Sequence, residues 1–112
     1  IVVAPIVREP DGVAMSSRNK YLVGNLRPQA AVLRRSIQVV RQTVAIAKKP
    51  VFAPKLKARV RQIVKAAPAA RLDYVEFFDP ETLKPATKVV RGTHMALAVF
   101  IGKTRLIDNS WL

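Results

Sequence analysis

The sequence predicts an α+β domain in which two main helices pack on a small antiparallel sheet of about three strands. Apolar residues recur at steps of three and four through the middle of the chain, which is typical of amphipathic helices. The last third instead holds short β-rich segments separated by turn residues, which favours an antiparallel meander. A chain of 112 residues is long enough for one domain with its own core.

The first 22 residues are predicted to form a strand or connector followed by a turn-rich loop. Residues 1–7 are a β-branched run interrupted by Pro5, which suits an edge strand or a connector. Pro10-Asp11-Gly12 is a turn signal, because proline presets φ and glycine accepts a positive φ. The hydroxyls of residues 16 and 17 favour a helix start or a capped turn.

Two helices are predicted next, over residues 27–48 and 54–67. Pro28 suits a first helical turn, and Pro50 and Pro68 stop the two patterns. One apolar face in each helix is expected to point inward: Ala30, Leu33, Ile37, Val40, Val44 and Ala47 in the first, and Leu56, Val60, Ile63 and Ala67 in the second.

Three strands follow, at residues 72–78, 95–101 and 105–109, with a turn at 79–82 and a polar connector at 83–93. The aromatic residues near these strands are expected in the core: Tyr74, Phe77, Phe78 and Phe100. Arg105 is expected to pair with Asp108 or with a carboxylate on a neighbouring strand. Trp111 is either a core plug or an exposed contact.

Composition excludes several classes of protein. There is no cysteine, which excludes a disulfide scaffold and a cysteine-ligated metal, and a single histidine, His94, excludes a histidine-pair metal site. We therefore expect no metal ligands in this chain. The longest uncharged apolar run, residues 95–101, is far shorter than the roughly 20 residues of a membrane span, so no membrane partner is expected. Without a secretory signal at its start, the protein is expected to be cytoplasmic.

The charge is strongly basic, with a formal net charge of +13. No acid occurs between Asp11 and Asp73, while 14 of the 20 basic residues lie there. A small basic nucleic-acid-binding module is therefore one hypothesis. Phe52 is the sole aromatic residue between Tyr21 and Tyr74, so the basic region lacks a stacking platform. This favours the simpler interpretation of a solvated cationic helix face and makes nucleic acid the less favoured partner.

The residues most suited to chemistry are Ser16, Ser17 and Arg18. Two hydroxyls and backbone N–H groups at a helix start, followed by a planar guanidinium, suit phosphate oxygens. From the residues alone, an ordinary helix cap explains the same pattern.

A longer match makes this stretch more specific. The string REPDGVAMSSRNKYL at residues 8–22 resembles the signature of the pantothenate synthetases (pantoate–β-alanine ligases), in their C-terminal domain. The stretches at residues 72–80 and 102–109 support the resemblance at similar spacing. It implies a single domain over residues 1–112, with the connector and ATP-phosphate loop in 1–22 and a helix–sheet body in 23–112.

The resemblance implies an ATP-dependent ligase of pantothenate biosynthesis, on the route to coenzyme A. That family of the nucleotidyltransferase superfamily condenses pantoate with β-alanine through pantoyl adenylate, giving pantothenate, AMP and pyrophosphate, with Mg²⁺ carried by ATP. Residue by residue, Ser16, Ser17 and Arg18 match the positions that stabilise the phosphates and the transition state. Met15 matches a contact with the adenosine, and Val7 matches the position whose backbone contacts adenine.

The chain also departs from the family pattern. It has no His-x-Gly-His motif and no glycine-rich strand-to-helix turn, so we expect it to lack the N-terminal Rossmann-like domain of the family. The resemblance assigns the pantoate and β-alanine pockets, and most contacts of the family homodimer, to that domain. The isolated chain is therefore expected to be inactive. A third hypothesis is that it is a folding unit that binds nothing by itself.

Overall fold

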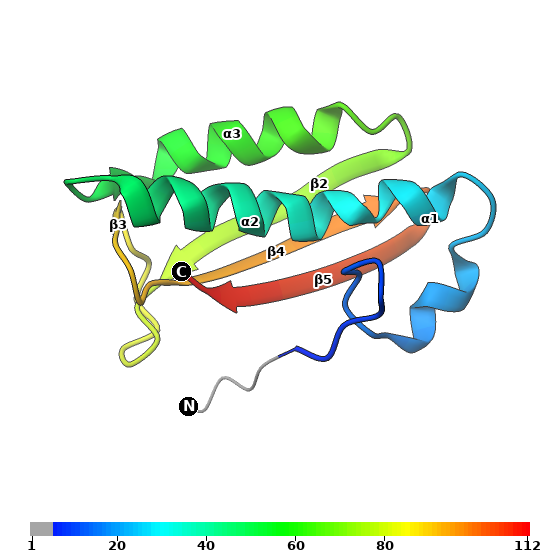
Figure 1. Cartoon of the computed structure of the whole chain (residues 1–112), viewed down its shortest axis with the longest axis horizontal. Helices are drawn as coiled ribbons and strands as arrows, with labels where there is room; N and C mark the ends of the chain where they lie inside the picture. Colours follow the sequence, from blue (N-terminus) through cyan, green and yellow to red (C-terminus); the bar gives the residue numbers. More distant parts are fainter. Residues whose placement is uncertain (1–5) are drawn as a thin grey trace.

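Residues 6–112 are described by the computed structural model, in which two long helices cover one face of a three-stranded sheet (Figure 1). The sheet is antiparallel, with the order β2–β4–β5, from β2 (Ala70–Phe78), β4 (His94–Ile101) and β5 (Thr104–Trp111). The predicted α+β class and the three strands are confirmed. The edge strand or connector predicted at residues 1–7 falls largely outside the described residues, and residues 6 and 7 belong to no strand.

The first predicted helix is two consecutive helices, α1 (Leu26–Gln29) and α2 (Ala31–Ile46). They meet at Ala30, whose N–H is shared between the carbonyls of Leu26 and Arg27, each at 3.2 Å. Its backbone stays in the right-handed helical region. Most of the predicted apolar face is buried, but Ala47 lies beyond the helix and is exposed.

The second predicted helix is α3 (Ala53–Lys65), which has a proline in its first turn. Leu56, Val60 and Ile63 are buried as predicted. Both helices pack on the sheet face that carries the inward residues of the central strand β4. Four of these are fully buried at alternate positions: Met95, Leu97, Val99 and Ile101.

The predicted polar connector at residues 83–93 is wrong in part. It contains β3 (Lys88–Val89), which pairs antiparallel with β1 (Val51–Phe52). Along the chain, β1 lies between the two long helices α2 and α3. Val89 is buried, and the N–H of Ala53 donates to the carbonyl of Thr87 at 2.8 Å. A two-residue strand is too short to show a period of two in the sequence. The predicted turn is present, with Asp79 accepting from the N–H groups of residues 81 and 82.

The aromatic residues divide between the two faces of the sheet. Phe77 is in the core, whereas Tyr74, Phe78 and Phe100 are half-buried on the face that lacks helices, so the core prediction holds for Phe77 alone. At one end of that face, buried His94 lies between the rings of Phe78 and Trp111, with ring centroids at 5.0 and 5.2 Å. Trp111 is 43% exposed.

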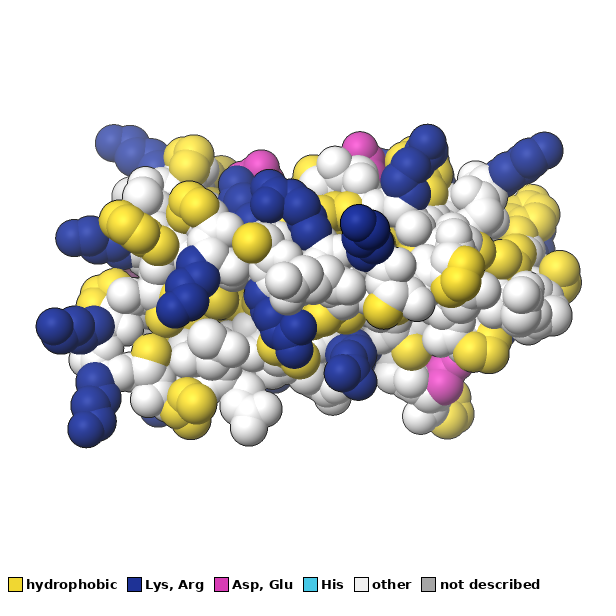
Figure 2. Space-filling model, turned by 90° about the horizontal axis from the view of Figure 1, so that it is seen from above, with side chains coloured by type: hydrophobic (Ala, Val, Ile, Leu, Met, Phe, Trp, Pro, Cys, Tyr) yellow, Lys and Arg dark blue, Asp and Glu magenta, His cyan; other side chains and the backbone are white. Residues whose placement is uncertain are grey.

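Figure 2 shows the molecule from above relative to Figure 1. Lysine and arginine side chains are spread over the surface in this view, with few acids among them. Most basic residues of α2 and α3 are exposed, as expected for a solvated cationic face. Within residues 6–112, no helix combines the length and apolarity that a bilayer crossing requires.

Candidate functional site

The loop before the helices is a small hairpin, here called the N-terminal hairpin, residues 7–16. Arg8 and Ala14 form an antiparallel bridge, and the N–H of Glu9 donates to the carbonyl of Val13 at 2.9 Å. The predicted turn is at its tip, where Gly12 has a φ of +88° and donates to the carbonyl of Glu9. A left-handed backbone at this position favours glycine.

The hairpin brings two of the predicted site residues together. The N–H of Met15 donates to the carbonyl of Val7 at 2.8 Å. Both side chains are mostly exposed, 60% for Met15 and 67% for Val7. Two apolar residues, eight positions apart in the sequence, are thus joined at the surface.

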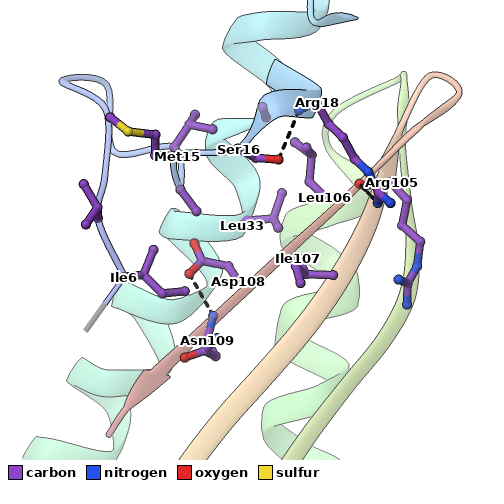
Figure 3. Close-up of a pocket in the computed structure, with 14 residues that line it drawn as sticks. Ile6, Met15, Ser16, Arg18, Leu33, Arg105, Leu106, Ile107, Asp108 and Asn109 are labelled. Atoms are coloured by element: carbon purple, nitrogen blue, oxygen red, sulfur yellow. Dashed lines mark hydrogen bonds between the residues drawn. The ribbon is translucent and has the colours of Figure 1, made fainter. Parts of the chain in front are cut away.

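The predicted serine–arginine motif forms a capped turn. Ser16 precedes the 3₁₀ helix η1 (Ser17–Tyr21), and its Oγ accepts from the N–H of Arg18 at 3.1 Å (Figure 3). The Nη1 of Arg18 donates to the carbonyl of Arg105 on β5 at 3.2 Å. This hydrogen bond places the guanidinium against the edge strand of the sheet.

An open cavity of about 570 Å³ lies between the N-terminal hairpin and β5. Val7, Met15, Ser16 and Arg18 line it, whereas Ser17 is exposed and lies outside the lining. The remaining lining combines apolar and polar side chains, including Ile6, Val13, Leu33, Leu106, Ile107, Arg105, Asp108 and Asn109 (Figure 3). An apolar wall with a few polar groups is typical of a small-molecule site.

An ion pair at the wall of this cavity, between Arg8 and the buried carboxylate of Asp108, was not predicted. Both carboxylate oxygens of Asp108 accept from Arg8, at 2.6 Å from Nη1 and 2.9 Å from Nη2. Asp108 is 2% exposed, and its Oδ1 also accepts from the N–H of Asn109 at 2.8 Å. The Nη1 of Arg8 reaches the carbonyl of Gly12 at 3.1 Å.

Of the two partners that the sequence left open for Arg105, the structure shows the carboxylate on a neighbouring strand and not Asp108. Residues three apart on a strand point to opposite faces, so Asp108 shares the helix-covered face with Leu106 while Arg105 points the other way. Arg105 instead donates to Asp73 of β2 at 2.9 Å, the other pairing that the sequence left open. The missed signal was an acid two residues after an inward leucine, which needs a partner once it is buried.

A second set of ionic contacts ties the hairpin to α1. Arg27 donates to Asp11 at 2.7 and 2.9 Å and to Glu9 at 3.0 Å. The hydrogen bond from Arg27 holds the pKa of Asp11 below its usual value, and the same bond raises the pKa of Arg27. Asn19 donates to Glu9 and, at 3.0 Å, to the carbonyl of Ala14.

Arg34 of α2 lies against the tip of the hairpin. A Cβ added at Gly12 would stand 3.2 Å from the Cγ of Arg34, so the two segments are closely packed. Burial lowers the pKa of Arg34, and the charges of Arg8 and Arg41 act in the same direction. Arg34 thus lies against the hairpin that carries Arg8, and Asp108 binds Arg8.

Comparison with known proteins identifies the family. The family model described as pantoate-beta-alanine ligase matches residues 1–111. The chain belongs to the pantoate–β-alanine ligase family. It is 46% identical over 112 residues to the pantothenate synthetase of Trichlorobacter lovleyi, covering 100% of this chain and 39% of that protein. The chain thus spans about two fifths of the length of the curated relatives it matches.

Solved structures of this ligase family have a similar fold. The pantothenate synthetase of Thermus thermophilus superposes with a TM-score of 0.83 at 34% identity, over 98% of this chain and 39% of that one. The pantoate-beta-alanine ligase of Francisella tularensis, described as a complex with β-γ ATP and β-alanine, matches with a TM-score of 0.52 at 25% identity. It covers 98% of this chain and 32% of that chain.

The described residues were also compared with the usual ligands of metal ions. Residues 6–112 contain no group of three or more histidine, cysteine, aspartate or glutamate side chains placed to bind a metal ion.

Proposed function

We propose that this chain is the C-terminal domain of a pantothenate synthetase and that it closes over ATP during adenylate formation. One arrangement carries the proposal: the bonded Val7–Met15 pair and the Ser16–Arg18 turn line the same cavity. An apolar pair beside hydroxyl and guanidinium donors matches a nucleotide, which has an apolar base and anionic phosphates.

In this proposal, adenine lies at the Val7 end of the cavity. The backbone of Val7 contacts the base and the side chain of Met15 packs on the adenosine. Both residues are fixed by their shared hydrogen bond, so the pocket is ordered before ATP arrives.

The phosphates lie at the other end, near Ser16, Ser17 and Arg18. A pantoate carboxylate oxygen attacks the α-phosphorus, forming a C–O–P bond while the bond to pyrophosphate breaks. Negative charge grows on the phosphoryl oxygens in that step, and preplaced donors stabilise it. Ser17 joins the group by turning toward the phosphates, since its side chain is exposed. Mg²⁺ carried with ATP would neutralise part of the phosphate charge.

The second step belongs to the rest of the enzyme. The amine of β-alanine attacks the pantoyl carbonyl, forms the amide and expels AMP. We assign the pantoate and β-alanine pockets to the part of the relatives that this chain does not cover, together with most dimer contacts. The chain alone is therefore inactive as a ligase, and the whole enzyme works in the cytoplasm.

The first test is an amide NMR titration of this chain with Mg-ATP, using tripolyphosphate as the control. Shifts centred on residue 7 and residues 15–18, with ATP and not with tripolyphosphate, support the proposal. Shifts spread over residues 34–65 with either ligand would favour the basic nucleic-acid-binding module. A titration at increasing salt separates the two further, because phosphate-tracking affinity falls steeply with salt.

The second test uses the full-length enzyme. Ser17→Ala or Arg18→Ala should slow adenylation and leave the folded state intact. Both side chains are exposed, so folding loses little when they are truncated. Parallel losses of activity and thermal stability would contradict the assignment.

A further inference from the structure

We infer that Asp108 is a positioning residue for the nucleotide site. Acting through Arg8, it holds the N-terminal hairpin against β5 so that hairpin and strand form one preordered cavity wall. This inference rests on the proposed function, because the position of the hairpin matters for ATP only if ATP binds there.

The geometry joins two parts of the chain 100 residues apart in sequence. Asp108 lies on the edge strand β5, and its two oxygens bind the two terminal nitrogens of Arg8 in parallel. Such a bidentate pair fixes angle as well as distance. Because Arg8 also reaches the carbonyl of Gly12, one guanidinium connects an arm of the hairpin, its tip and the strand.

This pair differs from the other ion pairs within residues 6–112. The Asp108 side chain is 1% exposed, whereas the other four paired carboxylates are 28% to 54% exposed. A buried pair is weak support for stability, since well-packed apolar residues often serve as well or better. A fixed orientation of the hairpin is something that apolar contacts of the same size would not supply.

The pair also determines which charges face the cavity. With its guanidinium bonded to Asp108, Arg8 adds little free positive charge beside the nucleotide. Arg18, whose side chain is exposed and bonded to a neutral carbonyl, remains available for phosphates. Loss of the Asp108 charge would release Arg8 as a second phosphate-binding cation that does not recognise adenine.

The test compares Asp108→Asn with Glu76→Gln in this chain. Both substitutions remove one negative charge, but Glu76 pairs with Lys57 at 3.1 Å on the surface and does not line this cavity. Amide hydrogen exchange is measured at Glu9 and Met15, whose N–H groups form the hairpin hydrogen bonds, and in the central strand β4. These two sets of amides report on the hairpin and on the body respectively.

In Asp108→Asn we expect the hairpin amides to exchange at least about tenfold faster, which corresponds to about 1.4 kcal/mol of opening free energy. Exchange in β4 should stay within about twofold. Glu76→Gln should change neither set. Unchanged hairpin exchange in Asp108→Asn would overturn the inference, and so would equal acceleration in β4, which would assign the pair to global stability.

A second variant covers the case in which Asp108→Asn does not fold. In Arg8→Met/Asp108→Leu both charges are removed, so no lone charge stays buried and thermal stability should be close to that of the parent. Its hairpin amides should nevertheless exchange faster. Full recovery of hairpin protection together with thermal stability would contradict a positioning role.

The ligand measurement keeps this inference separate from the proposed function. The ratio of the Kd for tripolyphosphate to the Kd for Mg-ATP should fall about tenfold in Asp108→Asn, because ATP loses its pocket while Arg8 gains access to phosphate. A parent chain with no preference for ATP would count against the proposed function, whereas the exchange result would still decide the role of Asp108.

Discussion

The N-terminal hairpin and the helix–sheet body are held together by different forces. The body is built on apolar side chains that lie fully buried between α2, α3 and the sheet. Within residues 6–112, the hairpin contributes only Val13 to the buried core, η1 contributes nothing, and Leu22 follows directly after η1. It is instead tied down by three of the five ion pairs in that part of the chain.

This difference explains the distribution of acids. The two acids that precede the basic region, Glu9 and Asp11, both bind Arg27, and Asp108 binds Arg8. Three of the seven acids therefore fix the hairpin, while the basic helices stay solvated. In this small domain, apolar burial provides the body and charge fixes the orientation of the loop.

The largest effect is expected from a cavity in the body. Ile37→Ala removes a fully buried side chain of α2 and should lower the free energy of unfolding by about 2–5 kcal/mol. Urea denaturation followed by circular dichroism measures it. Ile46→Ala is the matched control, because Ile46 is 76% exposed, and its effect should stay within about 0.5 kcal/mol. Similar losses in the two variants would contradict a core formed by this helix face.

A smaller effect is expected at the tip of the hairpin. Gly12→Ala combines a positive φ with a Cβ 3.2 Å from Arg34 and should cost about 1–2 kcal/mol. Gly24→Ala is the control: its φ is also positive, at +58°, but its Cβ would meet nothing within 4 Å. Gly12→Ala should therefore be the more harmful change by urea denaturation, and the reverse order would show that the hairpin tip yields easily.

A fall in pH should destabilise the body through His94. Burial lowers the pKa of His94, a residue of the body, below the usual 6.5. A histidine with a depressed pKa contributes stability that is present above pH 6.5 and is lost as pH falls toward the folded-state value. Thermal melting between about pH 7 and pH 5 should show this loss, and His94→Gln should reduce it. A flat profile in the parent chain would rule the contribution out.

The smallest effect is expected at Asp11. Its pairing with Arg27 is partly exposed, so Asp11→Asn should cost at most about 1 kcal/mol at neutral pH and less at high salt. The lowered pKa of Asp11 means that this stability is present above pH 3.8 and is lost below it. Parent and variant should therefore converge in melting experiments as the pH is lowered progressively below 3.8. A difference that persists there would point to a role other than the ion pair.

The body could be predicted from sequence because its signals are local. The helix faces around Leu33 and Leu56 repeat every three to four residues, and the β4 run is continuous. The capped turn at Ser16 is also a local event, and it was predicted as one. The family resemblance located the residues of the candidate site, and the structure brings four of the five to one cavity wall.

The remaining features depend on contacts between distant residues. No periodicity relates Arg8 to Asp108 or Val51 to Val89, because each contact appears only when the chain has folded. Tyr74 and Phe100 were predicted in the core because they are aromatic. The alternation of side chains along their strands places them on the sheet face that lacks helices. Ser17 could not be placed, since a capped turn leaves its side chain free to point either way.

The short pairing of β1 with β3 has a consequence for cutting and rejoining the chain. It anchors residues 88–89 beside the start of α3, so the segment after β2 is free only at its tip, around the turn at Asp79. Leu83 ends that tip with a φ of +60°, a conformation that a leucine adopts at a cost. A break in the backbone beside Leu83 would relieve that strain and leave the β1–β3, β2–β4 and β4–β5 pairings intact. The two resulting pieces would pair with each other in both sheets, β1 with β3 and β2 with β4, which makes this turn the natural point at which to split the domain into two chains that reassemble.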